Sequence, residues 1–249
     1  CWRAFRFIAD AVAPPVPATA QQIFEAARCF GRFLRDMDDL PAPPLAVTIP
    51  GFHDTSLRYR DFEAAVAADP HGRAAAAQPL VAALRARVSL AGAFDELAAG
   101  SLPMRVVHND CKLDNVLFDA RAGGALCVVD LDTVMPGCML YDVGDLVRSA
   151  SCLAAEDDAV TPVFSPDRYA TVLRGYLAGA GDLLCREELA GLAVAGRVVA
   201  YELALRFLTD HLLGDGYFAV SSPMQNRQRA ARQLQLLSSM ESRAGEMDA

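Results

Sequence analysis

The stretch that decides the fold lies mid-chain and reads Val106-Val107-His108-Asn109-Asp110-Cys111-Lys112-Leu113-Asp114-Asn115-Val116-Leu117-Phe118. After a turn it continues as Ala125-Leu126-Cys127-Val128-Val129-Asp130-Leu131-Asp132. Short runs of β-branched and aromatic residues flank a polar loop, so we expect a short strand on either side of that loop. The loop carries an acid, a lysine and an amide, and a second acid ends the strand that follows.

The spacing of these polar residues predicts phosphoryl transfer. It follows the pattern His-x-Asp-x-x-x-x-Asn, with a further aspartate at the end of the next strand. In that chemistry one carboxylate orients the attacking hydroxyl and accepts its proton, while an amide and a second carboxylate hold the metal that bridges the phosphates. Each residue alone is more commonly an ordinary turn residue. The combined spacing, in a strand–loop–strand context, favours the functional interpretation.

Each polar residue of the motif can be given a role in that reaction. Asp110 would be the base that positions the substrate hydroxyl, and Lys112 would offset charge on the transferring phosphate. Asn115 and Asp130 would bind ATP through magnesium, because that hard ion prefers oxygen ligands. His108 follows two valines and is expected to be a buried structural residue that holds the loop.

Composition limits the other possibilities. The chain has 249 residues, 53% of them hydrophobic, which is enough for a sizeable core, and its net charge of -8 argues against a nucleic-acid partner. It has no apolar run of membrane-spanning length and no signal-peptide pattern at its start. The seven cysteines are scattered and form no C-x-x-C pair. We therefore expect reduced thiols, a cytoplasmic location and no membrane partner.

The rest of the chain is expected to be mostly helical, with two short β-hairpin-like pieces around the polar loop. Thr19 and Gln22 can form a capping box at the start of an amphipathic helix over 20–37. Prolines and glycines divide the remainder, and the tail from Arg243 is expected to fray. Further helices are expected at 56–68, 75–99, 166–179, 186–213 and 223–241, and another opens within 141–148.

The remaining histidines are expected to have no part in the chemistry. His53 and His71 are interpreted as surface loop residues. His211 is interpreted as a helix-end residue whose charge complements the helix dipole. The four histidines and seven cysteines show no zinc-binding spacing.

These motifs resemble the aminoglycoside phosphotransferase family, which shares the protein-kinase-like fold. The run Asp130-Leu131-Asp132-Thr133-Val134-Met135-Pro136-Gly137, together with Tyr141-Asp142-x-Gly144-Asp145, is similar to the N-acetylhexosamine 1-kinases. Those enzymes phosphorylate the anomeric hydroxyl of N-acetylglucosamine or N-acetylgalactosamine. Residues 50–54 and 202–210 are similar to the same group. The resemblance implies a single domain, 1–249, folded as the C-terminal catalytic lobe.

The resemblance also implies three further site residues. Asp145 would start the next helix and tie down the catalytic loop, although an aspartate there could equally be a helix cap. Arg206 and Tyr217 would contact the sugar alongside Asp110. The alternatives are an i,i+4 ion pair between Arg206 and Glu202, and ordinary packing for Tyr217.

The family's smaller N-terminal lobe supplies a loop over the phosphates and an ATP-pairing lysine, and we find no such stretch in this sequence. The chain starts within an apolar run without a methionine, and Lys112 is its only lysine. We therefore expect a fragment, with 1–8 near the hinge between lobes and little activity on its own. Apolar surface near Trp2, Phe5 and Phe7 would favour self-association.

Two classes of function remain open. The first is an ATP-dependent small-molecule kinase acting on an N-acetylhexosamine, or on another alcohol such as an aminoglycoside, choline or homoserine. The second is a truncated, non-catalytic remnant that folds as a helical module and binds a sugar or a partner chain. The net charge does not decide between a neutral and a cationic substrate.

Overall fold

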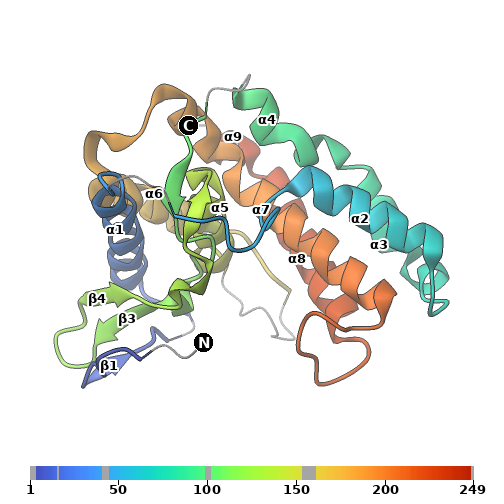
Figure 1. The fold of residues 1–249 in the computed structure, drawn as a ribbon, viewed down its shortest axis with the longest axis horizontal. Helices are drawn as coiled ribbons and strands as arrows, with labels where there is room; N and C mark the ends of the chain where they lie inside the picture. Colours follow the sequence, from blue (N-terminus) through green and yellow to red (C-terminus); the bar gives the residue numbers. More distant parts are fainter. Residues whose placement is uncertain (1–3, 16, 41–44, 99–101, 153–160, 248–249) are drawn as a thin grey trace.

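The computed structural model describes residues 4–15, 17–40, 45–98, 102–152 and 161–247, and helices predominate within these ranges (Figure 1). The helices are α1 Ala20–Met37, α2 Thr55–Ala68, α3 Ala74–Arg85, α4 Ala93–Ala98, α5 Met139–Ala150, α6 Pro166–Ala180, α7 Arg186–Leu213, α8 Gln225–Glu241 and α9 Ala244–Met247. Every described helix is too short or too polar to span a lipid bilayer. The mainly helical lobe expected from the sequence is confirmed.

Two small antiparallel sheets flank the polar loop, as expected. The strands are β1 Ala11–Val12, β2 Arg105–Val107, β3 Val116–Asp119, β4 Ala125–Val128 and β5 Met135–Gly137. One sheet has the order β1-β3-β4, and the other pairs β2 with β5. The loop thus leaves one sheet at β2 and enters the other at β3, which fixes both of its ends. Strand β1 was not foreseen, because two residues carry no periodic pattern.

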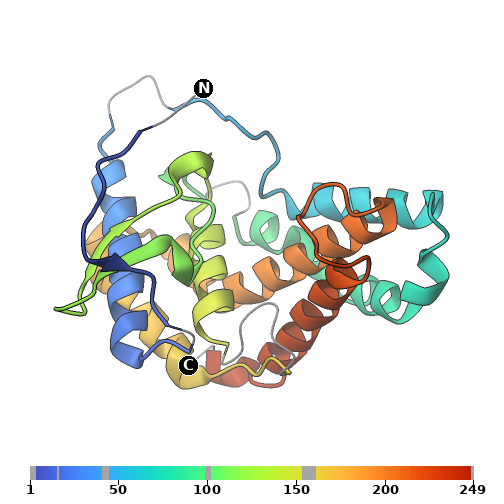
Figure 2. The same ribbon diagram turned by 90° about the horizontal axis from the view of Figure 1, so that it is seen from below.

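The helices form two groups that meet at α5 and α7 (Figure 1). On one side α1 packs along α6, and on the other α7 packs against α2 and α8. Seen from below, the three-stranded sheet lies against α1, on the side of the molecule away from α2 and α3 (Figure 2). Helix α7 contributes to both hydrophobic cores: Val199 belongs to the first and Ala200 to the second. The polar loop contributes Cys111 and Leu113 to the first core.

Helix boundaries that were predicted from local capping residues agree with the observed ones. Thr19 and Gln22 form the expected capping box on α1, with the Gln22 N–H donating to Thr19 Oγ1 at 3.2 Å and the Thr19 N–H donating to Gln22 Oε1 at 2.9 Å. Ser165 caps α6 ahead of Pro166, and Gly214 ends α7 with a φ of 105°. These boundaries agree with the expected ones because each depends on neighbouring residues alone.

The prediction of one long helix over 75–99 is wrong. Helix α3 ends at Arg85, a 3-10 turn follows at Val88–Gly92, and α4 begins at Ala93. The break lets Arg87 reach Glu241 of α8, with Nε–Oε1 and Nη2–Oε2 distances of 2.8 Å, and turns Phe94 into the core. An alanine-rich run carries no local signal for such a break, because the partners lie far away in sequence. Residue 99, the last of the expected helix, lies outside the described residues, as does Gly100, where that helix was expected to end.

The C-terminal end also departs from expectation. Helix α8 begins at Gln225, two residues after the expected start, and the tail forms the short helix α9. Met247 is buried, and the Tyr169 hydroxyl donates to its carbonyl at 3.2 Å. The described part of the tail is therefore docked on α6 rather than frayed.

A close approach of α5 to α7 depends on Gly144. A Cβ atom at this position would lie 2.5 Å from the Ala195 carbonyl oxygen of α7, a backbone atom that cannot move away. Only glycine allows this spacing without a shift of the helices. The contact holds α5, which follows the second sheet, against the helix that carries Glu202 and Arg206.

Candidate active site

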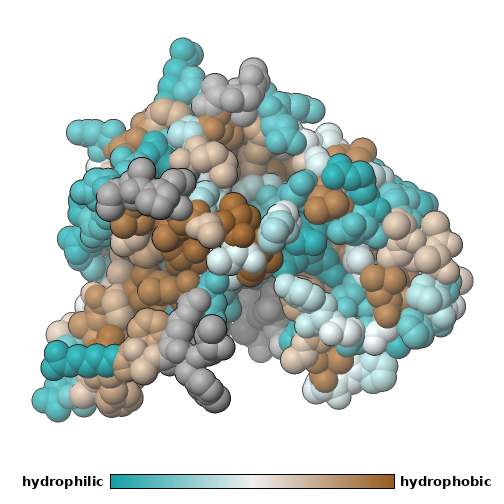
Figure 3. Space-filling view, in the orientation of Figure 1, coloured by the Kyte–Doolittle hydropathy of each residue, from teal (hydrophilic) through white to brown (hydrophobic). Residues whose placement is uncertain are grey.

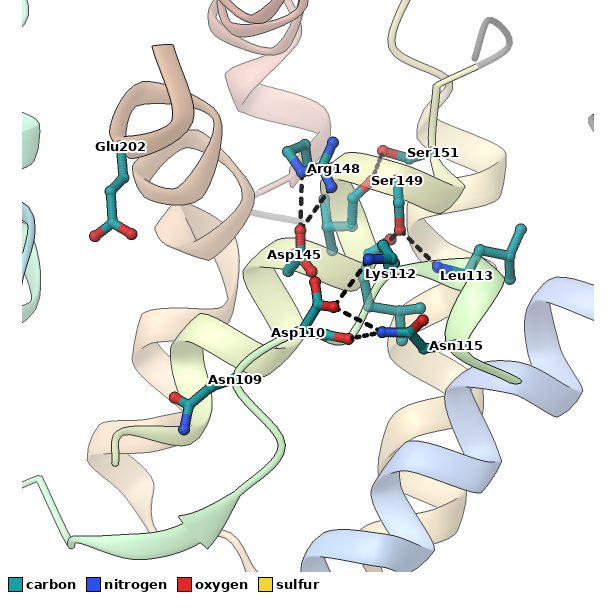
Figure 4. A network of polar contacts seen from close by, with 12 residues as sticks. Asn109, Asp110, Lys112, Leu113, Asn115, Asp145, Arg148, Ser149, Ser151 and Glu202 are labelled. Atoms are coloured by element: carbon teal, nitrogen blue, oxygen red, sulfur yellow. Dashed lines mark hydrogen bonds and ion pairs between the residues drawn. The ribbon is translucent and has the colours of Figure 1, made fainter. Parts of the chain in front are cut away.

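The loop between β2 and β3 gathers its acid, lysine and amide into one cluster. Lys112 Nζ donates to Asp110 Oδ2 at 2.9 Å, and Asn115 Nδ2 donates to the same oxygen at 2.8 Å and to the Asp110 carbonyl at 2.9 Å (Figure 4). The 3-10 turn Leu113–Asn115 brings the amide back to the acid. Within the described residues, Asp110 Oδ1 accepts no hydrogen bond, so one carboxylate oxygen is available to a substrate hydroxyl.

Lys112 carries its positive charge in this cluster. Burial lowers its pKa, but the hydrogen bond to Asp110 and the charge of that carboxylate outweigh burial and raise the pKa overall. The charges of Asp145 and Asp130 act in the same direction. The loop thus presents a cation directly beside its acid.

Asp130 lies next to Asn115 because of the strand pairing. The Val129 N–H donates to the Asn115 carbonyl at 2.9 Å, continuing the β3–β4 ladder by one residue. Asp130 then turns out of the strand with a φ of 62° and is exposed to solvent. The pairing therefore puts Asp130 one residue beyond the partner of Asn115, at the same edge of the sheet.

His108 is fully buried beneath the loop. Its Nε2 faces the Val129 carbonyl at 2.9 Å and therefore donates, which leaves Nδ1 to accept from the Asp110 N–H at 3.3 Å. Its ring lies edge-on to Phe30, with centroids 5.3 Å apart. This is the position expected of a residue that supports the loop from below.

The aspartate that ties down the loop is Asp142, not Asp145. Asp142 Oδ2 accepts from the His108 N–H at 2.9 Å, and Oδ1 accepts from the Asn109 N–H at 2.7 Å. Helix α5 begins at Met139, which puts Asp142 in its first turn and Asp145 one turn further on. Asp145 therefore cannot be a helix cap either.

Asp145 has a different partner. It is buried and pairs with Arg148 at 2.8 Å, close to the Lys112–Asp110 pair (Figure 4). Its charge contributes to the raised pKa of Lys112. A structural role beneath the lysine therefore replaces the predicted contact with the loop backbone.

His53 is not a surface residue, contrary to expectation. Its side chain is buried between Glu202 and the polar loop, with Nδ1 2.6 Å from Glu202 Oε1 and Nε2 2.9 Å from the Asn109 carbonyl oxygen. Both ring nitrogens face acceptors, so both donate and the ring is an imidazolium ion. The ring also stacks on Tyr141, with centroids 4.6 Å apart.

The charges of this buried pair set its response to pH. Burial lowers the pKa of His53, but the Glu202 charge and hydrogen bond raise it above the ordinary 6.5. Burial raises the pKa of Glu202, but His53 lowers it below the ordinary 4.5. The stabilisation from His53 is fully present below pH 6.5 and is lost as the pH rises through the raised value. The stabilisation from Glu202 is fully present above pH 4.5 and is lost as the pH falls through the lowered pKa of Glu202.

The structure brings Arg206 and Tyr217 together. Arg206 Nη2 lies 3.3 Å from the Tyr217 hydroxyl, and its guanidinium sits 5.1 Å from the centre of the Phe52 ring. The alternative ion pair with Glu202 does not form, because the two oxygens of that carboxylate bind His53 and Thr55. Tyr217 is 68% exposed, so its ring is available to a ligand.

The other two histidines differ from each other. His71 is exposed, as expected. His211 is buried in the last turn of α7, and burial first, then the charge of Arg73, lowers its pKa. A neutral ring does not complement the helix dipole, so that expectation for His211 is wrong.

Three cavities surround the loop. Asn109 and His53 line a cleft of about 620 Å³ bounded by α2 and α4. Asp130 lines an apolar cleft of about 590 Å³ that also touches Phe7 and Leu117. Lys112 lines a smaller cavity of about 120 Å³. Apolar surface gathers over the β3–β4 hairpin on the face that Figure 3 shows.

Sequence reasoning missed Asn109, Asp142, His53 and Glu202 as parts of this site. The sequence did contain one signal, an acidic residue among apolar neighbours. Such a residue indicates a buried charge, and a buried charge rarely lacks a partner. Glu202 stands among Tyr, Leu and Ala on α7, and Asp142 stands between Tyr and Val. That signal predicts that a partner exists but does not say which residue it is.

Comparison with known families identifies the family of this chain. A model of the phosphotransferase enzyme family (APH) matches residues 1–192, which is most of the chain. The chain therefore belongs to the phosphotransferase enzyme family. Its mainly helical lobe with small antiparallel sheets is consistent with the catalytic lobe of a protein-kinase-like phosphotransferase.

Proposed function

We propose that this protein transfers the γ-phosphoryl group of ATP to the anomeric hydroxyl of an N-acetylhexosamine. The observation that carries the reaction type is the Asp110 carboxylate. Two donors, Lys112 and Asn115, hold its Oδ2, and its Oδ1 accepts no hydrogen bond from any described residue. A general base for a substrate hydroxyl needs this combination of a fixed orientation and an open oxygen.

The chemical step follows from this arrangement. The acceptor oxygen forms a bond to the γ-phosphorus while the bond from that phosphorus to the ADP oxygen breaks, and Asp110 takes the hydroxyl proton. Lys112 lies beside Asp110 and would offset the charge on the transferring phosphate. The protein contributes mainly position and fixed charge, as is general for phosphoryl transfer.

Asn115 and Asp130 fit a magnesium ion that arrives with the nucleotide. Asn115 uses its amide nitrogen on Asp110, which leaves its amide oxygen as a ligand, and Asp130 is exposed beside it. No group of three or more His, Cys, Asp or Glu side chains suited to a metal occurs in the described part of the chain. Magnesium sites commonly combine one or two protein oxygens with phosphates and water. When bound, the ion would neutralise charge on the phosphates.

The apolar cleft beside Asp130 suits the base of the nucleotide. It is lined by Phe7, Leu117 and Val128 among others, and the Phe7 side chain is 88% exposed. A flat heteroaromatic base gains from contact with aromatic and branched side chains. A base in this cleft would place its phosphates toward the Asn115–Asp130 pair.

The ammonium group of Lys112 is hydrogen-bonded to Asp110, and Lys112 is the only lysine of the chain. Residues 1–249 therefore hold no second lysine to pair with the phosphates of ATP. We therefore propose that turnover requires a nucleotide-binding lobe in addition to residues 1–249, and we call that combination the complete enzyme. Residues 1–249 alone should form sugar phosphate at a small fraction of the complete enzyme's rate, because a half-built cleft open to water loses most of its positioning. Equal rates in a phosphate-transfer assay with ATP, magnesium and N-acetylglucosamine would contradict this.

Size-exclusion chromatography would show whether the exposed Phe5 and Phe7 cause self-association.

The charges around Arg206 favour a neutral acceptor over a cationic one. His53 and Arg206 are both cationic. The nearby carboxylate of Glu202 has both of its oxygens hydrogen-bonded, one to His53 and the other to Thr55.

Aminoglycosides and choline would meet these cations. The two carboxylates of the cleft that Arg206 and Tyr217 line are already bound: Asp61 pairs with Arg58, and Asp210 accepts from two backbone N–H groups. A sugar could instead place its carbon faces on Tyr217 and its hydroxyls on Arg206.

Replacement of Arg206 tests this substrate class. Arg206→Ala in the complete enzyme should raise the KM for the sugar about ten- to hundredfold, because a donor to a buried sugar oxygen is lost. The KM for ATP should change little. Arg186→Ala, at the exposed start of the same helix, is the matched control. An enzyme that ignores both amino sugars but phosphorylates kanamycin, choline or homoserine would overturn the substrate assignment.

The described cysteines are free thiols: Cys29, Cys111, Cys127, Cys138, Cys152 and Cys185. Reduced cysteines and the use of ATP both support a cytoplasmic location for the proposed reaction.

A further inference from the structure

The peptide bond that joins Asn109 to Asp110 is held at both of its polar groups. Its carbonyl oxygen lies 2.9 Å from His53 Nε2, and its N–H donates to His108 Nδ1 at 3.3 Å. Rotation of this peptide would turn the Asp110 side chain away from its partners. Two histidines that are distant in sequence therefore fix the orientation of the proposed base.

Asn109 itself is in a conformation that needs such support. Its φ of 63° lies in the left-handed region, which asparagine adopts more readily than most residues with a side chain but still at a cost, and it is 95% buried. Its N–H donates to Asp142 at 2.7 Å, and its side-chain amide donates to the Thr133 carbonyl at 2.9 Å. With the bond from His53, all the polar groups of this residue except the side-chain oxygen are engaged. A strained residue persists only where its surroundings hold it in this way.

His53 is held as firmly as the residue it contacts. Glu202 of α7 binds its other ring nitrogen at 2.6 Å, and Thr55 donates to the second oxygen of Glu202 at 2.7 Å. Tyr141 of α5 covers the face of the ring, and its hydroxyl lies 3.0 Å from Thr55 Oγ1. Arg206 is the other charged group that acts on the ring. The imidazolium therefore has one orientation, with Nε2–H directed at the Asn109 carbonyl.

We propose that His53 is a positioning residue for phosphoryl transfer: anchored by Glu202, it holds the Asn109 carbonyl and so fixes the backbone that aims Asp110. This inference rests on the proposed role of Asp110 and extends it to a residue on the loop that precedes α2. His53 does not touch the acceptor in this arrangement, because both of its ring nitrogens are used inside the protein. Its loss should affect the rate of transfer rather than substrate affinity.

Hydrogen exchange tests the positioning without any need for turnover. In His53→Gln, exchange of the loop amides within 105–117 should be at least about tenfold faster than in the wild type, the factor expected when one charge-assisted hydrogen bond is lost. Amides of α6 should not change. His71→Gln is the matched control, because His71 is an exposed loop histidine. Because His53→Gln leaves the buried Glu202 without its cation, a double variant that adds Glu202→Gln removes that charge and should show the same faster exchange.

The kinetic readout separates positioning from a general structural role. In the complete enzyme, His53→Gln should lower kcat about a hundredfold, the usual cost of misplacing a reacting group by about 1 Å, while both KM values stay within about threefold. Unchanged exchange in the loop of both variants would overturn the proposal, as would a raised sugar KM at unchanged kcat. Absence of turnover even in the wild type would count against the proposed function instead, and the exchange result would still decide the role of His53.

Discussion

Asp110→Asn in the complete enzyme should lower kcat by a factor on the order of 10³, with little change in the KM for the sugar or for ATP. The amide keeps the size of the side chain and can still accept from Lys112 or Asn115, but it cannot take a proton from the acceptor hydroxyl. The base acts mainly in the transition state, so its loss appears in the rate and not in affinity. The measurement is steady-state kinetics with both substrates varied.

Asp114→Asn is the control for that experiment. Asp114 lies in the same loop and is exposed, and we assign it no role in transfer. Its rate should stay close to that of the wild type. Near-normal turnover in Asp110→Asn would show that Asp110 is a turn residue that shapes the loop, which is the common role of aspartate in such positions.

The second large effect is expected at Asp130. Asp130→Ala should abolish magnesium-dependent transfer, because it removes the only carboxylate of the proposed ligand pair and leaves Asn115 alone. The rate should be measured as a function of free magnesium, together with binding of a non-hydrolysable ATP analogue in the presence and absence of the metal. Both the rate and the metal-dependent part of nucleotide binding should fall.

Asp119→Ala provides the comparison with an aspartate whose role is structural. Asp119 also ends a strand of the same sheet, but its carboxylate caps the local turn by accepting from the N–H groups of Arg121 and Ala122. It should leave the magnesium dependence intact. If Asp130→Ala leaves that dependence unchanged as well, Asp130 is only another strand-end residue.

The parts of the fold that could be predicted are those set by neighbouring residues. The capping box of Thr19 and Gln22 and the Ser165–Pro166 start of α6 are local signals, and each helix starts where its signal stands. The Asp110–Asn115 contact was also predictable, since the eight-residue loop 108–115 between two strands can bring only a few side chains together. Motif spacing carries that information directly.

The parts that could not be predicted depend on contacts between distant segments. His53 and Glu202 are 149 residues apart, and no pattern around either one names the other. The break after Arg85 has the same origin, because Arg87 leaves the helix to reach Glu241 of α8. Asp142 and Asp145 lie one helical turn apart, so the choice between them depended on where α5 begins, and Met139 opens it without a side-chain cap.

These distant contacts are also what connect the proposed acceptor site to the proposed base. Arg206 and Glu202 lie one turn apart on α7, and Glu202 holds His53 against the loop. Gly144 allows α5 and α7 to approach closely enough for Tyr141 to cover the His53 ring. The polar loop is therefore held by His53 and by Asp142 of α5 as well as by its two sheets.

The most direct test is to identify the product by phosphorus NMR. The complete enzyme, ATP and magnesium would be incubated separately with N-acetylglucosamine, N-acetylgalactosamine, kanamycin, choline and homoserine, with Asp110→Asn as the blank. We predict a new resonance of a sugar 1-phosphate, coupled to the anomeric proton, with one or both amino sugars and none in the blank. Phosphorylation of another alcohol alone, or an equal signal with Asp110→Asn, would contradict the account.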